Sequence, residues 1–158
     1  MQPGEALPRQ TYRTPDDEWD EYLIAERFAL WANASQLKFG TDPIDRQKSR
    51  IDRLLYRQDT VVALFEVKRR SMEFRQTPAG WITGRRKVED CRAAAAIFRL
   101  PVLLVVEFGC RTVAYLDTAT DHTVVPDWGR NDRNDPADRE AGARFSWDKF
   151  KRIWGPHT

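Results

Sequence analysis

The sequence is poor in the residues and runs that mark several common classes of protein. Its 158 residues include two cysteines and two histidines, none of them spaced as a zinc site or a catalytic pair: Cys91, Cys110, His122 and His157. No apolar run approaches the length of a membrane span, and the N-terminal stretch MQPGEALPRQ lacks the apolar region of a signal peptide. These absences predict a cytoplasmic protein with reduced thiols and no membrane segment.

The chain is instead rich in aromatic side chains. Apolar residues make up 41% of the sequence, with six Trp, four Tyr and eight Phe, which is typical of an ordered globular protein. The length fits one domain with a sizeable core, and no repeat indicates a solenoid. We expect a flexible N-terminal arm over residues 1–13, which are polar and contain two prolines, and a single domain over residues 14–158.

Charge is spread unevenly along the chain. Residues 41–92 hold 13 Lys and Arg against 8 Asp and Glu, a net charge of +5, although the whole chain carries only +2. If some of those acids bind a metal, the positive field around them is stronger than this count implies. A basic surface around a carboxylate cluster suits an anionic polymer, and a generic arginine-rich surface is the simpler alternative.

The stretch IDRLLYRQDTVVALFEVKRR, residues 51–70, predicts two strands joined at residues 58–60. Because strand residues alternate between the two faces of a sheet, Glu66 and Lys68 point the same way. A three-residue loop places Asp52 opposite Glu66, whereas a two-residue loop sends Asp52 to the other face. Two carboxylates so close repel each other, and a divalent metal between them relieves this better than one lysine. A surface ion-pair patch is the alternative, although the apolar neighbours of both acids argue for paired charges.

A helix is expected from Pro15 to about Asn33, with Thr14 as its N-cap. It carries an apolar stripe of Ile24, Phe28 and Trp31. Glu21 lies on that stripe and would reach a metal site at the edge of the sheet. Glu26 is the second choice, and a solvated helix acid is the alternative for either.

The segment between this helix and the hairpin is less regular. A short strand is expected at residues 37–39, ended by a turn at Gly40–Pro43. Asp45 competes with Asp52 as the first metal acid. We prefer Asp52 because it lies within an apolar run and can pair with the second strand.

A second helix is expected from Thr83, as N-cap, to Arg99. Its buried stripe is predicted to consist of Val88, Cys91, Ala95 and Phe98. Lys87 borders that stripe near the start of the helix. This position suits a contact to phosphate, helped by the backbone amides of the helix start, and an ordinary exposed lysine is the alternative.

The most apolar run, residues 100–108, predicts a central strand that is buried on both faces. Residues 111–116 are expected to pair with it through a turn near Gly109. Helix, hairpin, helix and buried strand together predict an α/β sandwich with a mixed sheet and a core over residues 14–116. Residues 117–144 are expected to form a polar loop. Residues 146–154 are expected to form a short helix that Ser146 caps and that packs Trp147, Phe150 and Ile153 onto the domain.

Asp52, then Glu66-Val67-Lys68 on a second strand, then an alanine-rich helix and a buried strand resemble the PD-(D/E)XK nuclease superfamily. The chain is most similar to its small stand-alone versions from phages and prophages, over roughly residues 14–116. Ile51 stands where the family name has Pro, at a position that varies in the superfamily. The resemblance implies a three-layer α/β/α sandwich with a mixed central sheet, as in restriction endonucleases.

The resemblance also implies roles for the charged residues. Asp52, Glu66 and the backbone carbonyl of Val67 would bind Mg²⁺ or Mn²⁺, and Lys68 would orient or activate the attacking water. Glu21 would match a first-helix acid that also binds metal, and Lys87 a basic residue of the second helix. Hard oxygen ligands select these two ions over zinc. Four further residues would hold the DNA backbone without reading its bases: Arg69, Arg70, Arg85 and Arg86.

The sequence therefore predicts a Mg²⁺- or Mn²⁺-dependent deoxyribonuclease that acts in the cytoplasm of a phage-infected or bacterial cell. An alternative of another class is a nucleic-acid-binding or assembly module that kept the fold without catalysis. A third is an α/β interaction protein with an ion-pair patch. The intact set of two acids and a lysine favours the enzyme. No separate recognition domain is seen, so a homodimer is kept as a source of sequence specificity.

Overall fold

The computed structural model of the protein describes residues 15–33, 39–43, 51–129 and 139–154. Its main elements, in chain order, are α1 (Pro15–Asn33), β1 (Phe39–Pro43), β2 (Arg53–Arg57), β3 (Thr60–Arg69), β4 (Trp81–Gly84), α2 (Arg85–Phe98), β5 (Val102–Glu107), η1 (Gly109–Arg111), β6 (Val113–Asp117), β7 (Thr123–Gly129), β8 (Arg139–Phe145), η3 (Trp147–Lys149) and β9 (Lys151–Trp154). In the ranges that the structure describes, no helix is long and apolar enough to cross a membrane.

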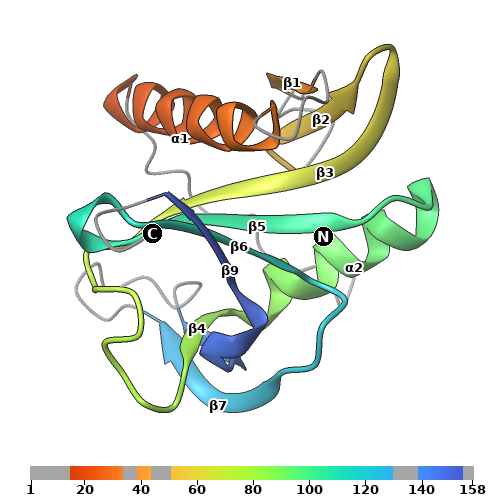
Figure 1. Cartoon of the computed structure of the whole chain (residues 1–158). Coiled ribbons are helices and arrows are strands. Elements are labelled where there is room, and N and C mark those ends of the chain that lie inside the picture. The colour runs from red at the N-terminus through yellow and green to blue at the C-terminus, as the bar shows by residue number, and fades with distance from the viewer. Residues whose placement is uncertain (1–14, 34–38, 44–50, 130–138, 155–158) are drawn as a thin grey trace.

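A mixed sheet of six strands forms the centre of the molecule, in the order β1-β2-β3-β5-β6-β9. Helix α1 covers one face of this sheet, and α2 lies on the other face together with a small sheet of β4, β8 and β7 (Figure 1). The predicted three-layer α/β/α sandwich with a mixed central sheet is therefore confirmed. The small sheet, which shares the layer of α2, was not predicted.

Strands β3 and β5 are the parallel pair at the middle of the sheet, and every other neighbouring pair in it is antiparallel. A parallel pair needs a long crossover connection, and α2 lies within that connection. Strand β5 is buried on both faces, as its apolar sequence predicts.

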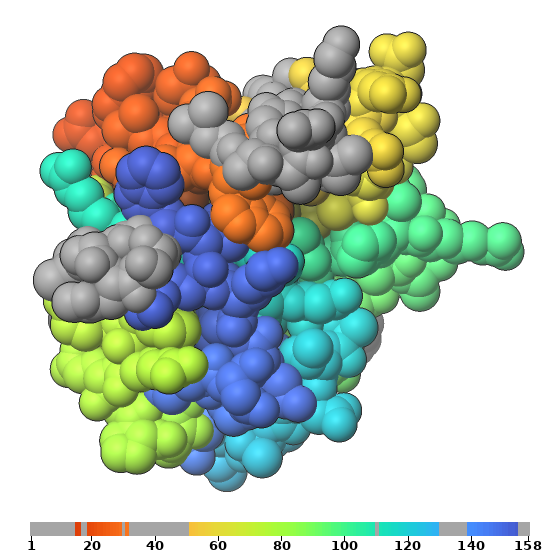
Figure 2. Space-filling view, viewed as in Figure 1, coloured from red at the N-terminus to blue at the C-terminus, as the bar shows by residue number. Residues whose placement is uncertain are grey.

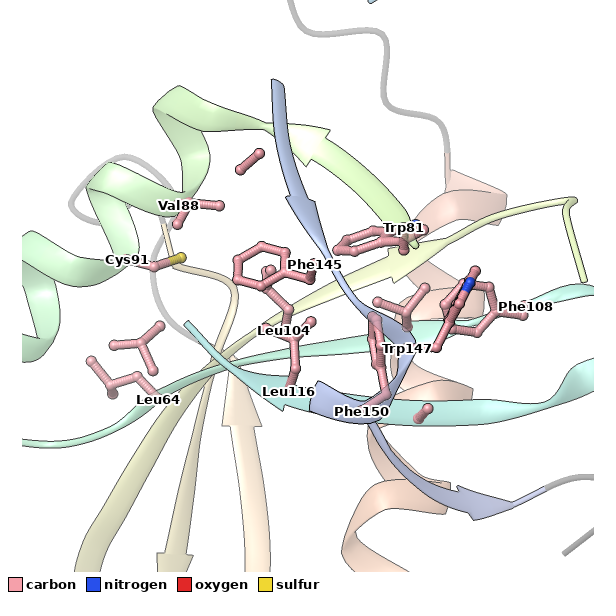
Figure 3. Close-up of a cluster of buried hydrophobic side chains, with 14 of the residues drawn as sticks. Leu64, Trp81, Val88, Cys91, Leu104, Phe108, Leu116, Phe145, Trp147 and Phe150 are labelled. Carbon is pink, nitrogen blue, oxygen red and sulfur yellow. The ribbon is translucent and has the colours of Figure 1, made fainter. Parts of the chain in front are cut away.

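Two apolar cores lie on the two faces of the central sheet. On the side of α2, Leu64 and Leu104 pack with the large aromatic side chains Trp81, Phe108, Phe145, Trp147 and Phe150 (Figure 3). On the side of α1, Ile24 and Phe28 pack against Phe65 and Val105. Because successive strand residues alternate between faces, Leu64 and Phe65 serve different cores, and Glu66 projects toward α2.

The hairpin of β2 and β3 reaches the predicted pairing by a different route. Its turn has two residues, Gln58 and Asp59, since Arg57 pairs with Thr60, so the three-residue loop was wrong. A positive φ of 53° at Gln58 is what such a tight turn requires. A β-bulge at Val62 then shifts the pairing by one residue, and Arg53 pairs with Phe65. The bulge cancels the effect of the shorter turn and restores Asp52 to its place beside Glu66.

Helix α1 has the predicted bounds, and its apolar stripe faces the sheet. Ile24 and Phe28 are buried and Trp31 is half-buried. The predicted cap Thr14, the N-terminal arm over residues 1–13 and Asp45 lie outside the described residues.

The expected turn at Gly40–Pro43 is instead part of β1, which pairs antiparallel with β2. Strand β1 lies at the edge of the sheet. Pro43, which cannot donate a backbone hydrogen bond, is tolerated there.

The predicted start of the second helix was wrong by one residue, because the N-cap is Gly84 and not Thr83. Thr83 is buried in β4 and pairs with Ala143, and α2 begins at Arg85. Val88 and Cys91 are buried as predicted, but Phe98 is 60% exposed because the last turns of α2 project beyond the sheet (Figure 2).

The C-terminal third contains more strand than predicted. Residues 117–144, expected as a polar loop, contain β7 and most of β8, and Ala143 is fully buried. The expected helix over residues 146–154 is a single 3₁₀ turn followed by β9. Trp147, Phe150 and Ile153 are buried as predicted, but Ile153 belongs to the core on the α1 side. Ile153 reaches that core because it lies in a strand of the central sheet. A single amphipathic helix would have placed all three side chains in one core.

Candidate active site

The candidate site is centred on Glu66, in the buried strand β3. The side chain is 5% exposed, although it carries a carboxylate. The amides of Leu64 and Arg70 bond to the chain of β5 and its preceding residue, so those of Glu66 and Lys68 point the same way. The pairing of β3 with β5 therefore fixes the backbone position from which the side chain of Glu66 projects.

Two lysines contact the same oxygen of this carboxylate. Lys68 Nζ lies 3.3 Å from Glu66 Oε1, and Lys87 Nζ, from the first turn of α2, lies 3.2 Å from it. The other oxygen, Oε2, is buried and has no hydrogen-bond partner within the part of the chain that the structure describes. A buried carboxylate oxygen without a partner is costly, so this oxygen is placed to accept a further cation.

Lys68 is the more deeply enclosed of the two lysines. Burial lowers the pKa of its ammonium, and the positive charges of Lys87 and Arg70 act in the same direction, whereas Glu66 and Asp52 oppose them. A lowered pKa increases the share of neutral amine at a given pH. That is the form of a lysine that can accept a proton.

Asp52 lies just before β2 and reaches across to β3. Its Oδ2 accepts a hydrogen bond of 2.9 Å from the backbone N–H of Val67. In a strand, the N–H and the C=O of one residue point to the same edge. The carbonyl of Val67 therefore also points toward the side on which Asp52 lies.

These donors fit a hard divalent ion. The set comprises the carboxylate of Asp52, the unpartnered oxygen of Glu66 and the carbonyl of Val67, all of them oxygens. The described residues contain no group of three or more His, Cys, Asp or Glu side chains that could hold a metal by themselves. Two carboxylates and a carbonyl suffice for Mg²⁺ or Mn²⁺ because such ions keep several waters and bind substrate phosphate.

Glu21 of α1 lies beside a buried arginine. It is 8% exposed, and its Oε1 lies 3.7 Å from the guanidinium of Arg53, which is also buried. Glu21 lines an open pocket of about 230 Å³ together with Val67 and Lys68, so it borders the candidate site. Its role as a metal ligand stays a prediction. Glu26 is half-buried on α1.

Ion pairs within the protein involve several of the arginines predicted to hold DNA. Arg69 pairs with Asp20 and Glu107, and two pairs lie in the first turns of α2: Arg85 with Glu89 and Arg86 with Glu140. A guanidinium of Arg70 donates to the carbonyl of Arg69. The DNA contacts of these arginines stay predictions.

The sequence reasoning missed three buried or half-buried charges. Arg53 pairs with Glu21, Glu107 joins Arg27 of α1 to Arg69 of β3, and Glu140 lies at the start of α2. Glu107 had a signal, because it is the one charge in the most apolar run of the chain. Arg53 and Glu140 had none, because the ion-pair partner of each lies on an element far away in the sequence.

Comparisons with known proteins show the family and the fold of the chain. The family described as phage putative PDDEXK endonuclease matches residues 7–153. No curated protein matches the sequence. Among solved structures, the chain is similar to Hjc, a Holliday junction resolvase from the archaeal hyperthermophile Archaeoglobus fulgidus, with a TM-score of 0.51 and 13% identity over 83% of this chain and 90% of that chain. That likeness shows a shared restriction-endonuclease-like fold. The family match spans nearly all described elements, and the chain belongs to the family of phage putative PDDEXK endonucleases.

Proposed function

We propose that the protein is a DNA endonuclease that hydrolyses phosphodiester bonds with Mg²⁺ or Mn²⁺ held by Asp52, Glu66 and the carbonyl of Val67. The observation that supports this most directly is the state of Glu66. One of its oxygens contacts two lysines, and the other is buried without a hydrogen-bond partner among the described residues. A purely structural ion pair would not need an acid and two lysines at the edge of an apolar hairpin.

The chain's own residues would divide the work as follows. Asp52 and Glu66 would hold the ion, whose chemistry when bound would be to polarise the phosphoryl oxygen and to lower the pKa of water. Lys68 lies against Glu66 and, with its lowered pKa, positions the attacking water and accepts its proton at Nζ. Lys87 presents a positive charge to the negative charge that develops on phosphate.

The substrate is proposed to be DNA. The solved neighbour is named as a Holliday junction resolvase, so branched DNA belongs among the substrates to be tried. The predicted backbone contacts, the homodimer and the cytoplasmic location all stay predictions.

Cleavage assays test the proposal. Labelled linear, circular, single-stranded and branched DNA are incubated with Mg²⁺ or Mn²⁺ and wild type, Asp52→Ala, Glu66→Ala or Lys68→Ala. We expect metal-dependent cutting by the wild type, reduced by at least about 100-fold in each variant. Glu89→Ala is the matched control, because it removes an acid that is 60% exposed and is paired to a surface arginine of α2.

Two outcomes would contradict the enzyme. DNA binding that persists in all variants, without cutting by any of them, would favour the nucleic-acid-binding or assembly module. Absence of both binding and cutting would leave the ion-pair patch of an interaction protein. Calorimetric titration of Mn²⁺ into the wild type and Glu66→Ala gives an independent check, since metal binding should be lost in that variant.

A further inference from the structure

Helix α2 begins without a cap of its own. Strand β4 passes directly into it (Figure 1), and the N-cap position is Gly84, in an extended conformation with φ −61° and ψ 130°. The first N–H groups of a helix have no partner within the helix, and a Ser, Thr, Asp or Asn at this position usually supplies one. Glycine has no side chain that can do so.

Glu140 of β8 fills the space that a capping side chain would take. A Cβ built on Gly84 would lie 1.8 Å from Glu140 Oε1 and 3.0 Å from its Cδ. The register of the small sheet explains this placement, because Gly84 pairs with Gly142 and Glu140 therefore extends past the end of β4. The side chain of Glu140 is only 11% exposed, and it also forms an ion pair of 3.6 Å with Arg86.

The first turn of α2 carries Lys87, which contacts Glu66. A negative charge at a helix N-terminus stabilises the first turn, because the unpaired N–H groups give that end a partial positive charge. If the first turn opens, Lys87 moves with it, since only two residues separate Lys87 from Gly84.

We propose that Glu140 is a positioning residue: its carboxylate closes the N-terminus of α2 in place of an N-cap side chain and thereby holds Lys87 on Glu66. The small sheet then has a function in the site, because β8 carries this carboxylate. The effect on cleavage rests on the proposed function, whereas the closing of the helix does not.

Amide hydrogen exchange tests the cap directly. In Glu140→Ala, the amides of residues 85–88 should exchange about five- to thirtyfold faster than in wild type, as expected for a lost cap. Glu89→Ala is the matched control, since it also removes an acid from an arginine of the same helix and should leave exchange at the helix start nearly unchanged.

A second substitution at Gly84 gives a rescue. The three atoms nearest to a Cβ at this position all belong to Glu140, and the φ of Gly84 suits any residue. In the wild type, Gly84→Ser displaces Glu140 but supplies a cap in its place, so exchange should change little there. In Glu140→Ala the same substitution should slow exchange, because serine caps the helix. If serine accelerates exchange or leaves it unchanged in Glu140→Ala, the proposed cap is wrong.

Cleavage kinetics then test the link to Lys87. Glu140→Ala should cut DNA about two- to fivefold more slowly, less than the change in exchange, because only the open fraction of α2 loses activity. In a Lys87→Met background, Glu140→Ala should cost nothing further. An equal loss in both backgrounds would show that Glu140 acts on something other than Lys87 and would overturn the proposal.

The two measurements separate this inference from the proposed function. If the wild type cuts no DNA, the nuclease proposal fails and the link to catalysis fails with it, while the exchange data still decide whether Glu140 caps α2. If the wild type cuts DNA and exchange is unchanged in Glu140→Ala, the nuclease stands and the cap is wrong.

Discussion

Asp52 accepts a hydrogen bond from the backbone N–H of Val67, the residue that follows Glu66 in β3. Strand β2 begins at Arg53, so Asp52 lies just before the strand residues that pair with β3. Its carboxylate bonds to β3 through the N–H of Val67. The same side chain therefore continues the hairpin and supplies charge to the candidate site.

Substitution of Asp52 should separate these two contributions. Asn keeps an oxygen that can accept the bond from Val67 but loses the charge. We expect the free energy of unfolding of Asp52→Asn to lie within about 1 kcal/mol of the wild-type value. Its cleavage rate should fall by at least about 100-fold. Asp52→Ala should lose a similar factor in cleavage and also about 1–3 kcal/mol in the free energy of unfolding, because an N–H of Val67 is left unpaired. Urea denaturation and cleavage assays measure the two effects. Equal stability of the Asn and Ala variants would contradict the structural contribution.

Lys87 should oppose metal binding even as it assists cleavage. Its ammonium contacts the carboxylate that is proposed to bind the ion, and like charges at this range repel. Lys87→Met should bind Mn²⁺ about three- to tenfold more tightly than wild type and cut DNA more slowly. Calorimetric titration of Mn²⁺ checks the first part. Lys149→Met, far along the chain in a 3₁₀ turn, serves as the control for loss of one positive charge, and equal tightening in both variants would mean that only net charge matters.

Glu107 should contribute to stability by joining α1 to the central sheet. It is 7% exposed in β5 and pairs with Arg27 of α1 and Arg69 of β3. Glu107→Gln should lower the free energy of unfolding by about 1–3 kcal/mol, since two guanidinium groups then face a neutral amide. Because the side chain of Arg69 is 60% exposed and solvent screens its pair with Glu107, we expect a loss in the lower part of that range. Glu89→Gln, which weakens an exposed pair, should cost less than about 0.5 kcal/mol. Both free energies of unfolding are measured by urea denaturation. Equal losses in Glu107→Gln and Glu89→Gln would show that the ion pairs of Glu107 add no stability.

Cys91 should be unreactive in the folded protein. Burial raises the pKa of its thiol to about 12, and the nearby carboxylate of Glu66 adds to the shift. At pH 8 the thiolate fraction is then smaller than that of an ordinary thiol by about 1,000-fold, and a thiol-specific disulfide reagent should react correspondingly slowly. The measurement uses a Cys110→Ser variant, with the same protein in urea as the reference.

The same shift predicts how stability depends on pH. Because the folded thiol keeps its proton to higher pH, its contribution is fully present below pH 9.0 and is lost as the pH rises toward about 12. Wild type should therefore lose stability relative to Cys91→Ala between those values. A constant difference between the two proteins across that interval would contradict the raised pKa.

The main elements of the fold could be predicted because their signals are local. The apolar stripe of α1, the alternation in β3 and the continuous apolar run of β5 each follow from one short stretch. The small sheet could not be predicted in this way. Strands β7 and β8 contain Gly, Pro and many charged residues, and they are strands only because β4 lies alongside and Ala143 and Phe145 fill the core next to α2.

The candidate site shows the same division. Glu66 and Lys68 share a face in any strand, so their proximity was predictable from spacing alone. The contact of Lys87 with Glu66 was only partly predictable, because it depends on where α2 crosses the sheet. Arg53 and Glu140 had no sequence signal. Their partners, Glu21 and Arg86, are far away in the sequence and come close only in the folded protein.

The two-residue turn and the bulge at Val62 together set the register between β2 and β3. Each feature alone changes the pairing by one residue, and together they cancel. In this sequence, a two-residue turn without the bulge would place Asp52 opposite Phe65, on the face of α1. The acids themselves would be untouched, yet they would no longer lie side by side. The bulge is therefore as much a part of the candidate site as the two carboxylates that it aligns.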